Sequence, residues 1–190
     1  MPTRSLLQQA PTFCLPTYHR ECPACSDGLD FPLAWSPDHW CGHRIAGRYP
    51  LLARFAQGGM GVLFTTEAQP LPDGRLLPAL VKIAAVRPGR DAPAQSPAGL
   101  GLAAEARFLQ EMSGVAGVPL HLASGYDPAH QVRYLVEQRF VDALSLEEYL
   151  DRQGPRPVSQ ALELTLRLLA ICAQIHARGV VHLDVKPRNV

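Results

Sequence analysis

The sequence has no excess of either charge and no long apolar run. Its 190 residues carry 18 lysine and arginine side chains against 17 aspartate and glutamate side chains, a formal net charge of +1. A balance this close to zero gives no electrostatic case for a nucleic-acid partner or a membrane surface. No uninterrupted apolar stretch approaches the roughly 20 residues of a membrane span, and the N-terminus lacks the apolar core of a signal peptide. We therefore expect a cytoplasmic protein with no membrane segment and no nucleic-acid partner.

General disorder is excluded by composition, because 47 % of the residues are hydrophobic and 18 % are charged. The length suits one domain, or a domain with a small attached module. Residues 1–45 are rich in proline, cysteine, histidine and tryptophan and show no regular period. From residue 46 onward, strand and helix patterns follow one another. We predict a Cys/Pro-rich extension over residues 1–45 and one domain over residues 46–190.

Four of the five cysteines lie within the first 41 residues. In a reducing compartment this clustering favours a metal ion over disulfides. The stretch CPAC is a tight turn that can present two thiolates to one ion, and tetrahedral zinc would order a segment that has no core of its own. The candidate zinc ligands are Cys14, Cys22, Cys25 and Cys41, with His39 or His43 as a replacement for one of them. Ordinary reduced cysteines are the alternative. Cys172, within an apolar helix pattern, is interpreted as a core residue.

The rest of the chain predicts strands first, with one inserted helix, and helices afterwards. This order is typical of an α+β fold. The predicted strands lie at about 49–56 and 60–67, around Lys82, and at about 118–125 and 131–138; the predicted helices lie at about 101–112, 145–152 and 158–178. In the last helix, leucine, isoleucine and alanine cover most of the circumference. Such a helix requires burial on nearly all sides, and we expect these 190 residues to leave much of it exposed.

Three local features carry chemistry. Lys82 lies in the apolar strand ALVKIAAV, where an ammonium is costly to bury unless it is paired. Glu105, in the following helix, is the candidate partner; a lysine that reaches water from an edge strand is the alternative. The glycines of AQGGMG can close over a phosphate with backbone N–H donors, although glycines are also common in ordinary hairpin turns. Finally, HLDVKPRN supplies a base, a cation and a metal-binding amide in Asp184, Lys186 and Asn189.

The order of these features resembles the protein kinase family, most closely the bacterial Ser/Thr kinases whose nucleotide loop reads G-x-G-G-M-G. The likeness covers about residues 48–190. It implies a kinase-like small lobe of about five antiparallel strands plus one helix, followed by the first helices of an incomplete helical lobe. It also implies transfer of the γ-phosphoryl group of ATP to a Ser or Thr hydroxyl of a protein substrate, with Mg²⁺ as cofactor.

The resemblance also implies roles for single residues. Lys82 would hold the α- and β-phosphates and pair with Glu105. Asp184 would accept the proton of the substrate hydroxyl, Lys186 would neutralise charge on the transferred group, and Asn189 would ligate magnesium. The implied ATP-binding set further contains Ala56, Gly58, Gly59, Met60, Gly61, Leu63 and Leu80. The segment that contacts adenine is expected within VEQRFVD.

The sequence departs from the family pattern at several points. Ala56 replaces the first glycine of the nucleotide loop, and Leu80 replaces a small alanine that packs on adenine. Leu183 replaces an arginine that in the family binds the phosphorylated activation loop. The 190 residues contain no D-F-G aspartate, so we expect no turnover from this chain by itself. Two alternatives remain: a non-catalytic interaction module, either pseudokinase-like or built on a zinc knob, and one half of a split kinase whose C-terminal half is a second chain.

Overall fold

The structure is a computed structural model that describes residues 40–58, 61–84, 97–182 and 185–190. They belong to two compact units, each considered by itself. The first unit contains the residues up to Phe108 together with His121–Arg139, and the second contains Leu109–Leu120 with Phe140–Val190. The predicted or weighed site residues that lie outside the described residues are Cys14, Cys22, Cys25, His39, Gly59, Met60, Leu183 and Asp184.

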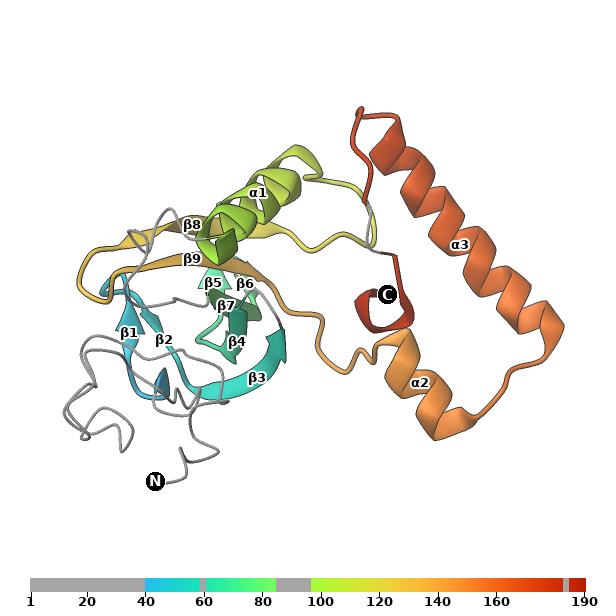
Figure 1. Ribbon diagram of the computed structural model, residues 1–190, viewed down its shortest axis with the longest axis horizontal. Helices are drawn as coiled ribbons and strands as arrows, with labels where there is room; N and C mark the ends of the chain where they lie inside the picture. Colours follow the sequence, from blue (N-terminus) through green and yellow to red (C-terminus); the bar gives the residue numbers. More distant parts are fainter. Residues whose placement is uncertain (1–39, 59–60, 85–96, 183–184) are drawn as a thin grey trace, which may run out of the picture. The chain divides into compact units, whose positions relative to one another are not determined.

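An antiparallel sheet of five strands forms the centre of the first unit (Figure 1). In spatial order its strands are β3 (Ala53–Gly58), β4 (Gly61–Thr65), β7 (Ala79–Ala84), β9 (Val132–Gln138) and β8 (His121–Asp127). Two short hairpins accompany it: β1 (Arg44–Ile45) with β2 (Tyr49–Pro50), and β5 (Gln69–Pro70) with β6 (Leu76–Leu77). With helix α1 (Pro97–Glu111), this arrangement confirms the predicted α+β class and the five antiparallel strands.

One face of the sheet carries the main hydrophobic core. Residues paired directly across neighbouring strands share a face; Phe64 of β4 is paired with Val81 of β7, and both are fully buried. The core cluster consists of Trp40, Ile45, Tyr49, Leu51, Val62, Phe64, Ala79, Val81, Ile83, Val132 and Val136. Four of these side chains come from residues 40–51, so this short segment is part of the same core as the sheet. The boundary predicted near residue 45 stays a prediction.

Helix α1 approaches the opposite face of the sheet. Leu102 and Ala106, four residues apart and therefore on one side of the helix, are both buried. Glu105 lies between them in sequence and reaches Lys82 of β7. The helix thus brings an acidic side chain to the face that does not carry the main core.

The second unit contains α2 (Leu146–Gln153), α3 (Val158–His176) and a short 3₁₀ turn, η5 (Pro187–Asn189). Helix α2 begins with a capping box, in which the Ser145 hydroxyl accepts the Glu148 N–H at 3.2 Å and the Glu148 carboxylate accepts the Ser145 N–H at 2.9 Å. The predicted ranges of both helices agree with the structure to within two residues at each end.

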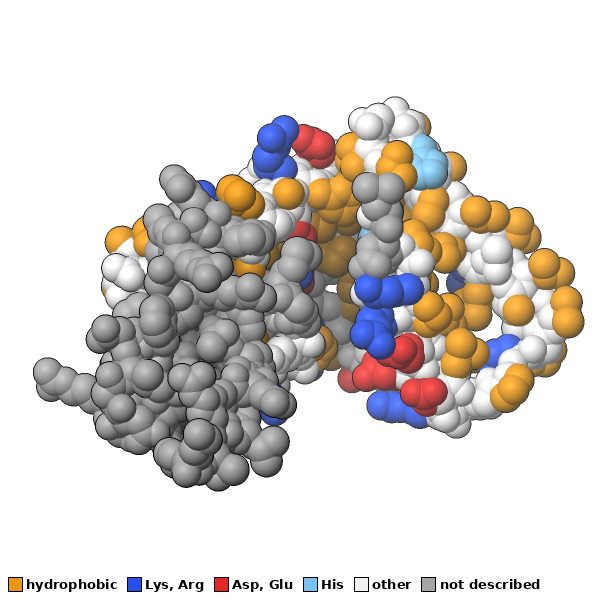
Figure 2. Space-filling view, viewed as in Figure 1, with side chains coloured by type: hydrophobic (Ala, Val, Ile, Leu, Met, Phe, Trp, Pro, Cys, Tyr) orange, Lys and Arg blue, Asp and Glu red, His pale blue; other side chains and the backbone are white. Residues whose placement is uncertain are grey.

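Helix α3 leaves most of its apolar surface exposed, as expected for these 190 residues. Ile175 is its one buried residue, whereas Val158, Leu162, Leu166 and Leu169 are each more than half exposed. Figure 2 shows hydrophobic side chains, in orange, along this helix. Within the described part of the chain, α3 is also the one helix that is long and apolar enough, by length and composition alone, to cross a membrane.

Candidate functional site

Lys82 lies on β7, on the face of the sheet that looks away from the main core. It is paired with Leu63 of β4 and with Leu135 of β9, so these side chains share its face. Leu80, two residues earlier on the strand, lies on the same face and is 6 % exposed. The Lys82 side chain is itself only 16 % exposed. The strand therefore removes most of an ammonium-bearing side chain from water.

Glu105 supplies the counter-charge from α1. The Lys82 Nζ donates hydrogen bonds to both carboxylate oxygens of Glu105, at 2.7 Å to Oε1 and 2.6 Å to Oε2. The pairing expected between these two residues is therefore present, and the alternative of an edge-strand lysine is wrong because β7 lies between β4 and β9. An ammonium has three N–H donors, and no described residue other than Glu105 accepts one from Lys82. This arrangement leaves one donor for an anion while Glu105 stays bound.

The glycine-rich hairpin connects β3 to β4 on the sheet edge beside this pair. Gly58 is paired with Gly61 where the hairpin closes, and the register shifts between Arg54 and Ala56. Ala56 is exposed and is paired with Leu63. At Gly61 an added Cβ would collide with the carbonyl oxygen of Ile83 on β7. This glycine is therefore required by the close approach of two strands, independently of any ligand.

Glu137 of β9 is a buried acid that the sequence analysis did not single out. It is paired with Leu80, so it shares the face of Lys82, and it is 9 % exposed. Burial, followed by the negative charge of Glu105, raises the pKa of Glu137 to about 7, against the opposing effect of Lys82. The signal that identified Lys82, a charged residue within an apolar strand, is also present in YLVEQ and could have identified Glu137.

Lys186 and Asn189 belong to the second unit. The Asn189 N–H donates to the Lys186 carbonyl oxygen at 2.8 Å, and both side chains are exposed. The end of this segment is attached to α2: the Leu146 N–H donates to the Val190 carbonyl oxygen at 2.7 Å, and Arg188 lies 3.4 Å from a Glu147 carboxylate oxygen. The backbone of this turn is therefore held in place while its two predicted site residues remain accessible.

Of the four predicted zinc ligands, only Cys41 lies within the described residues, where it is half-buried and has a free thiol. In the described ranges, no group of three or more His, Cys, Asp or Glu side chains is placed so that it could hold a metal ion. Cys172 is half-buried on α3. The four-cysteine zinc site stays a prediction.

No protein-family model matches the sequence. The serine/threonine-protein kinase PrkC of Bacillus subtilis is 25 % identical over 151 residues, which are 78 % of this chain and 21 % of PrkC. The serine/threonine-protein kinase Pkn2 of Myxococcus xanthus is 32 % identical over 146 residues, which are 77 % of this chain and 16 % of Pkn2. This chain therefore spans about a fifth of the length of the curated relatives it matches.

Solved structures show the same likeness at the level of the fold. The crystal structure of the PknI kinase domain of Mycobacterium tuberculosis is similar with a TM-score of 0.57 at 18 % sequence identity. The similar region covers 78 % of this chain and 56 % of that domain. Since this region is longer than the five-stranded sheet and α1 together, the likeness extends beyond the small sheet-based unit.

Proposed function

Because this chain belongs to the bacterial-type serine/threonine protein kinase-like family, we propose that it binds ATP and magnesium for transfer of a phosphoryl group to a protein hydroxyl. The observation that carries the proposal is the ion pair between Lys82 and Glu105, with both Nζ–O distances below 2.8 Å. An ion pair on the strand next to a glycine-rich hairpin is what the family uses to hold the phosphates of ATP.

The residues present fit an ATP phosphate group. Lys82 is one of only two lysines in the sequence, the other being Lys186, and both stand at positions where the family uses a lysine. Glu105 fixes the Lys82 ammonium while one N–H donor stays available. In this proposal the backbone of Gly58, Gly59 and Gly61 would cover the phosphates. The family resemblance assigns magnesium binding to the Asn189 amide.

The remaining residues act on the protein substrate in this proposal. Asp184 would orient the Ser or Thr hydroxyl and accept its proton as the hydroxyl oxygen bonds to the γ-phosphorus of ATP. The bond between that phosphorus and the β–γ bridging oxygen would break at the same time, and ADP would leave. Lys186 stabilises the negative charge on the transferred group. We expect no turnover from these 190 residues by themselves, because they contain no D-F-G aspartate, which in the family holds the principal magnesium ion.

The pocket for the adenine base should be tight. Leu80 is buried on the face of Lys82, where the family has a small alanine, and its larger side chain crowds the base. Ala56 replaces a glycine in the hairpin. These two residues favour weak nucleotide binding, and they are the reason to keep a pseudokinase-like interaction module as the second candidate function.

Lysine labelling tests ATP binding directly. An ATP acyl phosphate transfers its acyl group to a nearby lysine amine and releases ATP, and mass spectrometry then identifies the modified lysine. We expect labelling of Lys82 that excess ATP suppresses, and we expect a Leu80→Ala variant to need less ATP for the same protection. Arg75→Lys, which places a new lysine on an exposed hairpin side chain that is 75 % exposed, is the matched control. Labelling of this control should not respond to ATP. Equal labelling at Lys82 with and without ATP would exclude a nucleotide site there.

The four-cysteine zinc site and the cellular location are further proposals. If Cys14, Cys22, Cys25 and Cys41 form a site, the purified chain should carry close to one zinc per molecule. The Cys22→Ser variant should lose this zinc and keep its strands.

We also propose a cytoplasmic location, in which α3 is an internal helix of a kinase domain. The paired charges of Glu163 and Arg167 within α3 support this reading over a membrane span. Cell fractionation would test it.

A further inference from the structure

Glu137 is a buried acid that the proposed phosphoryl transfer leaves unused. It belongs to β9, lies on the face of Lys82 and is 9 % exposed. It is directly paired with Leu80 of β7 on one side and with His121 of β8 on the other. The Cβ atoms of directly paired residues are about 4.5–5.5 Å apart. The carboxyl of Glu137 is therefore an immediate neighbour of the Leu80 side chain, and Lys82 lies diagonally across from it.

No described residue donates a hydrogen bond to the Glu137 carboxyl. Lys82 donates to Glu105 instead, and the Nε2 of His121 lies 3.0 Å from the Ser124 hydroxyl. Burial and the charge of Glu105 raise the pKa of Glu137 to about 7, as expected for a carboxyl that has no bound partner. Buried polar groups in proteins are nearly always hydrogen-bonded. This carboxyl therefore takes its donor from outside the described residues, either from water or from a ligand.

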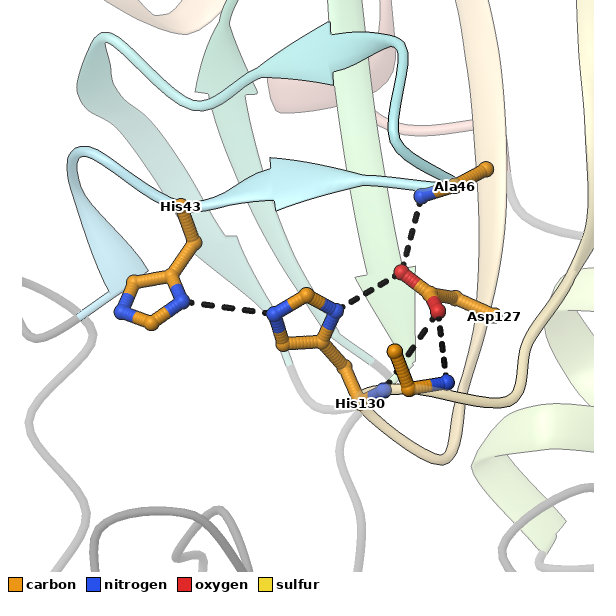
Figure 3. Close-up of polar contacts among 5 residues, drawn as sticks. His43, Ala46, Asp127 and His130 are labelled. Atoms are coloured by element: carbon orange, nitrogen blue, oxygen red, sulfur yellow. Dashed lines mark hydrogen bonds and ion pairs between the residues drawn. The ribbon is translucent and has the colours of Figure 1, made fainter.

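The first unit contains another buried carboxyl, and that one has several hydrogen-bond partners (Figure 3). Asp127, which is 2 % exposed, accepts the Ala46 N–H at 2.8 Å through its Oδ2 and the Ala129 N–H at 2.9 Å through its Oδ1. Its Oδ2 also lies 2.8 Å from the Nδ1 of His130, whose Nε2 is hydrogen-bonded to the Nδ1 of His43 at 3.3 Å. This fold therefore surrounds a structural carboxyl with donors of its own. The acid of β9 has no such donors, so a purely structural role does not account for it.

The surroundings of Glu137 fit the base of a nucleotide. Its carboxyl oxygens are not sealed from the surface, so a ligand atom can reach them. In the proposed function the base lies against Leu80 while Lys82 holds the phosphates, and the 6-amino group of adenine is on the edge of the base remote from the sugar. An amino group donates, and a carboxyl oxygen accepts whether the acid is ionised or protonated. Resting on that proposed function, we propose that Glu137 is a specificity-determining residue whose carboxyl accepts a hydrogen bond from the 6-amino group of adenine.

Such a contact distinguishes nucleotides by the group at position 6 of the purine. A purine that has only hydrogen at this position would displace water from the Glu137 carboxyl and offer it no donor. A site built to hydrogen-bond a ligand group rejects the analogue that lacks this group, because the buried polar group of the protein is then left unpaired. Crowding by Leu80 affects both purines alike. A preference for the amino-bearing base would therefore come from Glu137, and this hydrogen bond would offset part of the crowding.

Competition between two nucleotides tests the inference on the whole chain. Lys82 is labelled with the ATP acyl phosphate, and the concentrations of ATP and of purine riboside triphosphate that halve the labelling are compared. The second nucleotide differs from ATP only in lacking the 6-amino group. We expect ATP to be more effective by about ten-fold or more. Glu137→Met, which keeps the length of the side chain and removes the acceptor, should reduce this ratio to about two-fold or less. Glu137→Gln keeps a carbonyl acceptor and should retain most of the preference. Glu67→Met, at an exposed glutamate of the same unit, is the matched control and should behave like the unmodified chain.

The outcomes separate this inference from the proposed function. If ATP protects Lys82 but the two nucleotides are equally effective, or if Glu137→Met leaves their ratio unchanged, the inference is overturned and ATP binding stands. An equal loss of affinity for both nucleotides in Glu137→Met would mean that the carboxyl acts near Lys82 and not on the base, which also overturns it. Protection by neither nucleotide would overturn the proposed function, and this inference with it. Circular dichroism checks that each variant is folded, and Glu137→Leu replaces Glu137→Met should the latter fail to fold.

Discussion

The segment 40–51 and helix α3 are opposites in regularity and in burial. The segment contains only four residues in strands, β1 and β2, yet Trp40, Ile45 and Leu51 are at most 1 % exposed. Helix α3 is regular over 19 residues, and Ile175 is its one buried residue. The irregular segment thus contributes to the core, whereas the regular helix contributes almost nothing to it.

The difference shows that an apolar sequence pattern indicates that a segment must be buried. It does not indicate which other part of the protein buries it. The side chains of residues 40–51 fill the face of a sheet within the same unit. The leucines of α3 have the pattern of a helix covered on most sides, but within these residues they remain in contact with water. Fully burying each such leucine is worth about 1.5–3 kcal/mol, so several exposed leucines forgo an amount comparable to the whole stability of a domain, about 5–15 kcal/mol.

The largest effect we expect is on the association state. The exposed apolar surface of α3 should make the 190-residue chain self-associate, and a chain that ends near residue 155 should be monodisperse. Light scattering on both chains measures this difference directly. A monodisperse, cooperatively melting monomer of residues 1–190 would show that α3 finds another burial site, and the contrast with residues 40–51 would disappear.

A smaller effect is expected from truncating single side chains in the two regions. Trp40→Ala empties a fully buried site in the core and should lower the free energy of unfolding by about 3–5 kcal/mol. Leu166→Ala, at a position that is 65 % exposed, should change it by less than about 0.5 kcal/mol. Urea unfolding followed by circular dichroism gives both values. Similar losses in the two variants would show that α3 is packed in solution as tightly as the segment 40–51.

The smallest effect concerns two glutamates that contrast in burial. The pKa of Glu137 in the folded chain is about 7, above its ordinary value of 4.5, so the folded state binds the proton more tightly than the unfolded state. The free energy of unfolding should therefore fall as the pH rises from about 4.5 to about 7, by about 3 kcal/mol in all at roughly 1.4 kcal/mol per pKa unit.

Glu137→Gln removes the charge and tests this pH dependence. The variant should match the unmodified chain near pH 4 and exceed its stability by up to about 3 kcal/mol at pH 8. Glu163→Gln, at an exposed ion pair of α3, is the control and should change stability by at most about 1 kcal/mol. Denaturant unfolding of the unmodified chain and both variants, near pH 4 and at pH 8, gives the four changes in the free energy of unfolding. A loss of stability in Glu137→Gln at pH 8 would mean that the carboxylate is stabilised by a partner.

The sequence predicted the sheet and the Lys82–Glu105 pair because both follow from local rules. Strand patterns and the glycine-rich hairpin mark the strands, and a cation within an apolar strand requires a counter-charge, for which the next helix offers Glu105. These arguments need only the identity of neighbouring residues and the order of elements along the chain. The residues implied by the family resemblance, such as Asp184 and Asn189, stay predictions about function.

The contacts that sequence reasoning missed join residues far apart in the chain. His43 and His130 are 87 positions apart, and no period or spacing relates them. The burial of Glu137 likewise depends on its pairing with Leu80 and on the nearby Glu105, which only the folded sheet brings together. The packing of Trp40 on the sheet was missed because residues 1–45 have no regular pattern, and irregular segments bury side chains without leaving a period in the sequence.

Gly61 affects what can be inferred about the evolution of this chain from the residues that it keeps. Since the carbonyl of Ile83 leaves no room for a side chain there, a chain of this fold would need this glycine in order to fold, whether or not it binds a nucleotide. Lys82 and Glu105 form an ion pair, and under the proposed function both could be replaced in a descendant that no longer bound a nucleotide. A glycine at position 61 therefore indicates the fold alone, whereas under the proposed function the Lys82–Glu105 pair indicates the chemistry.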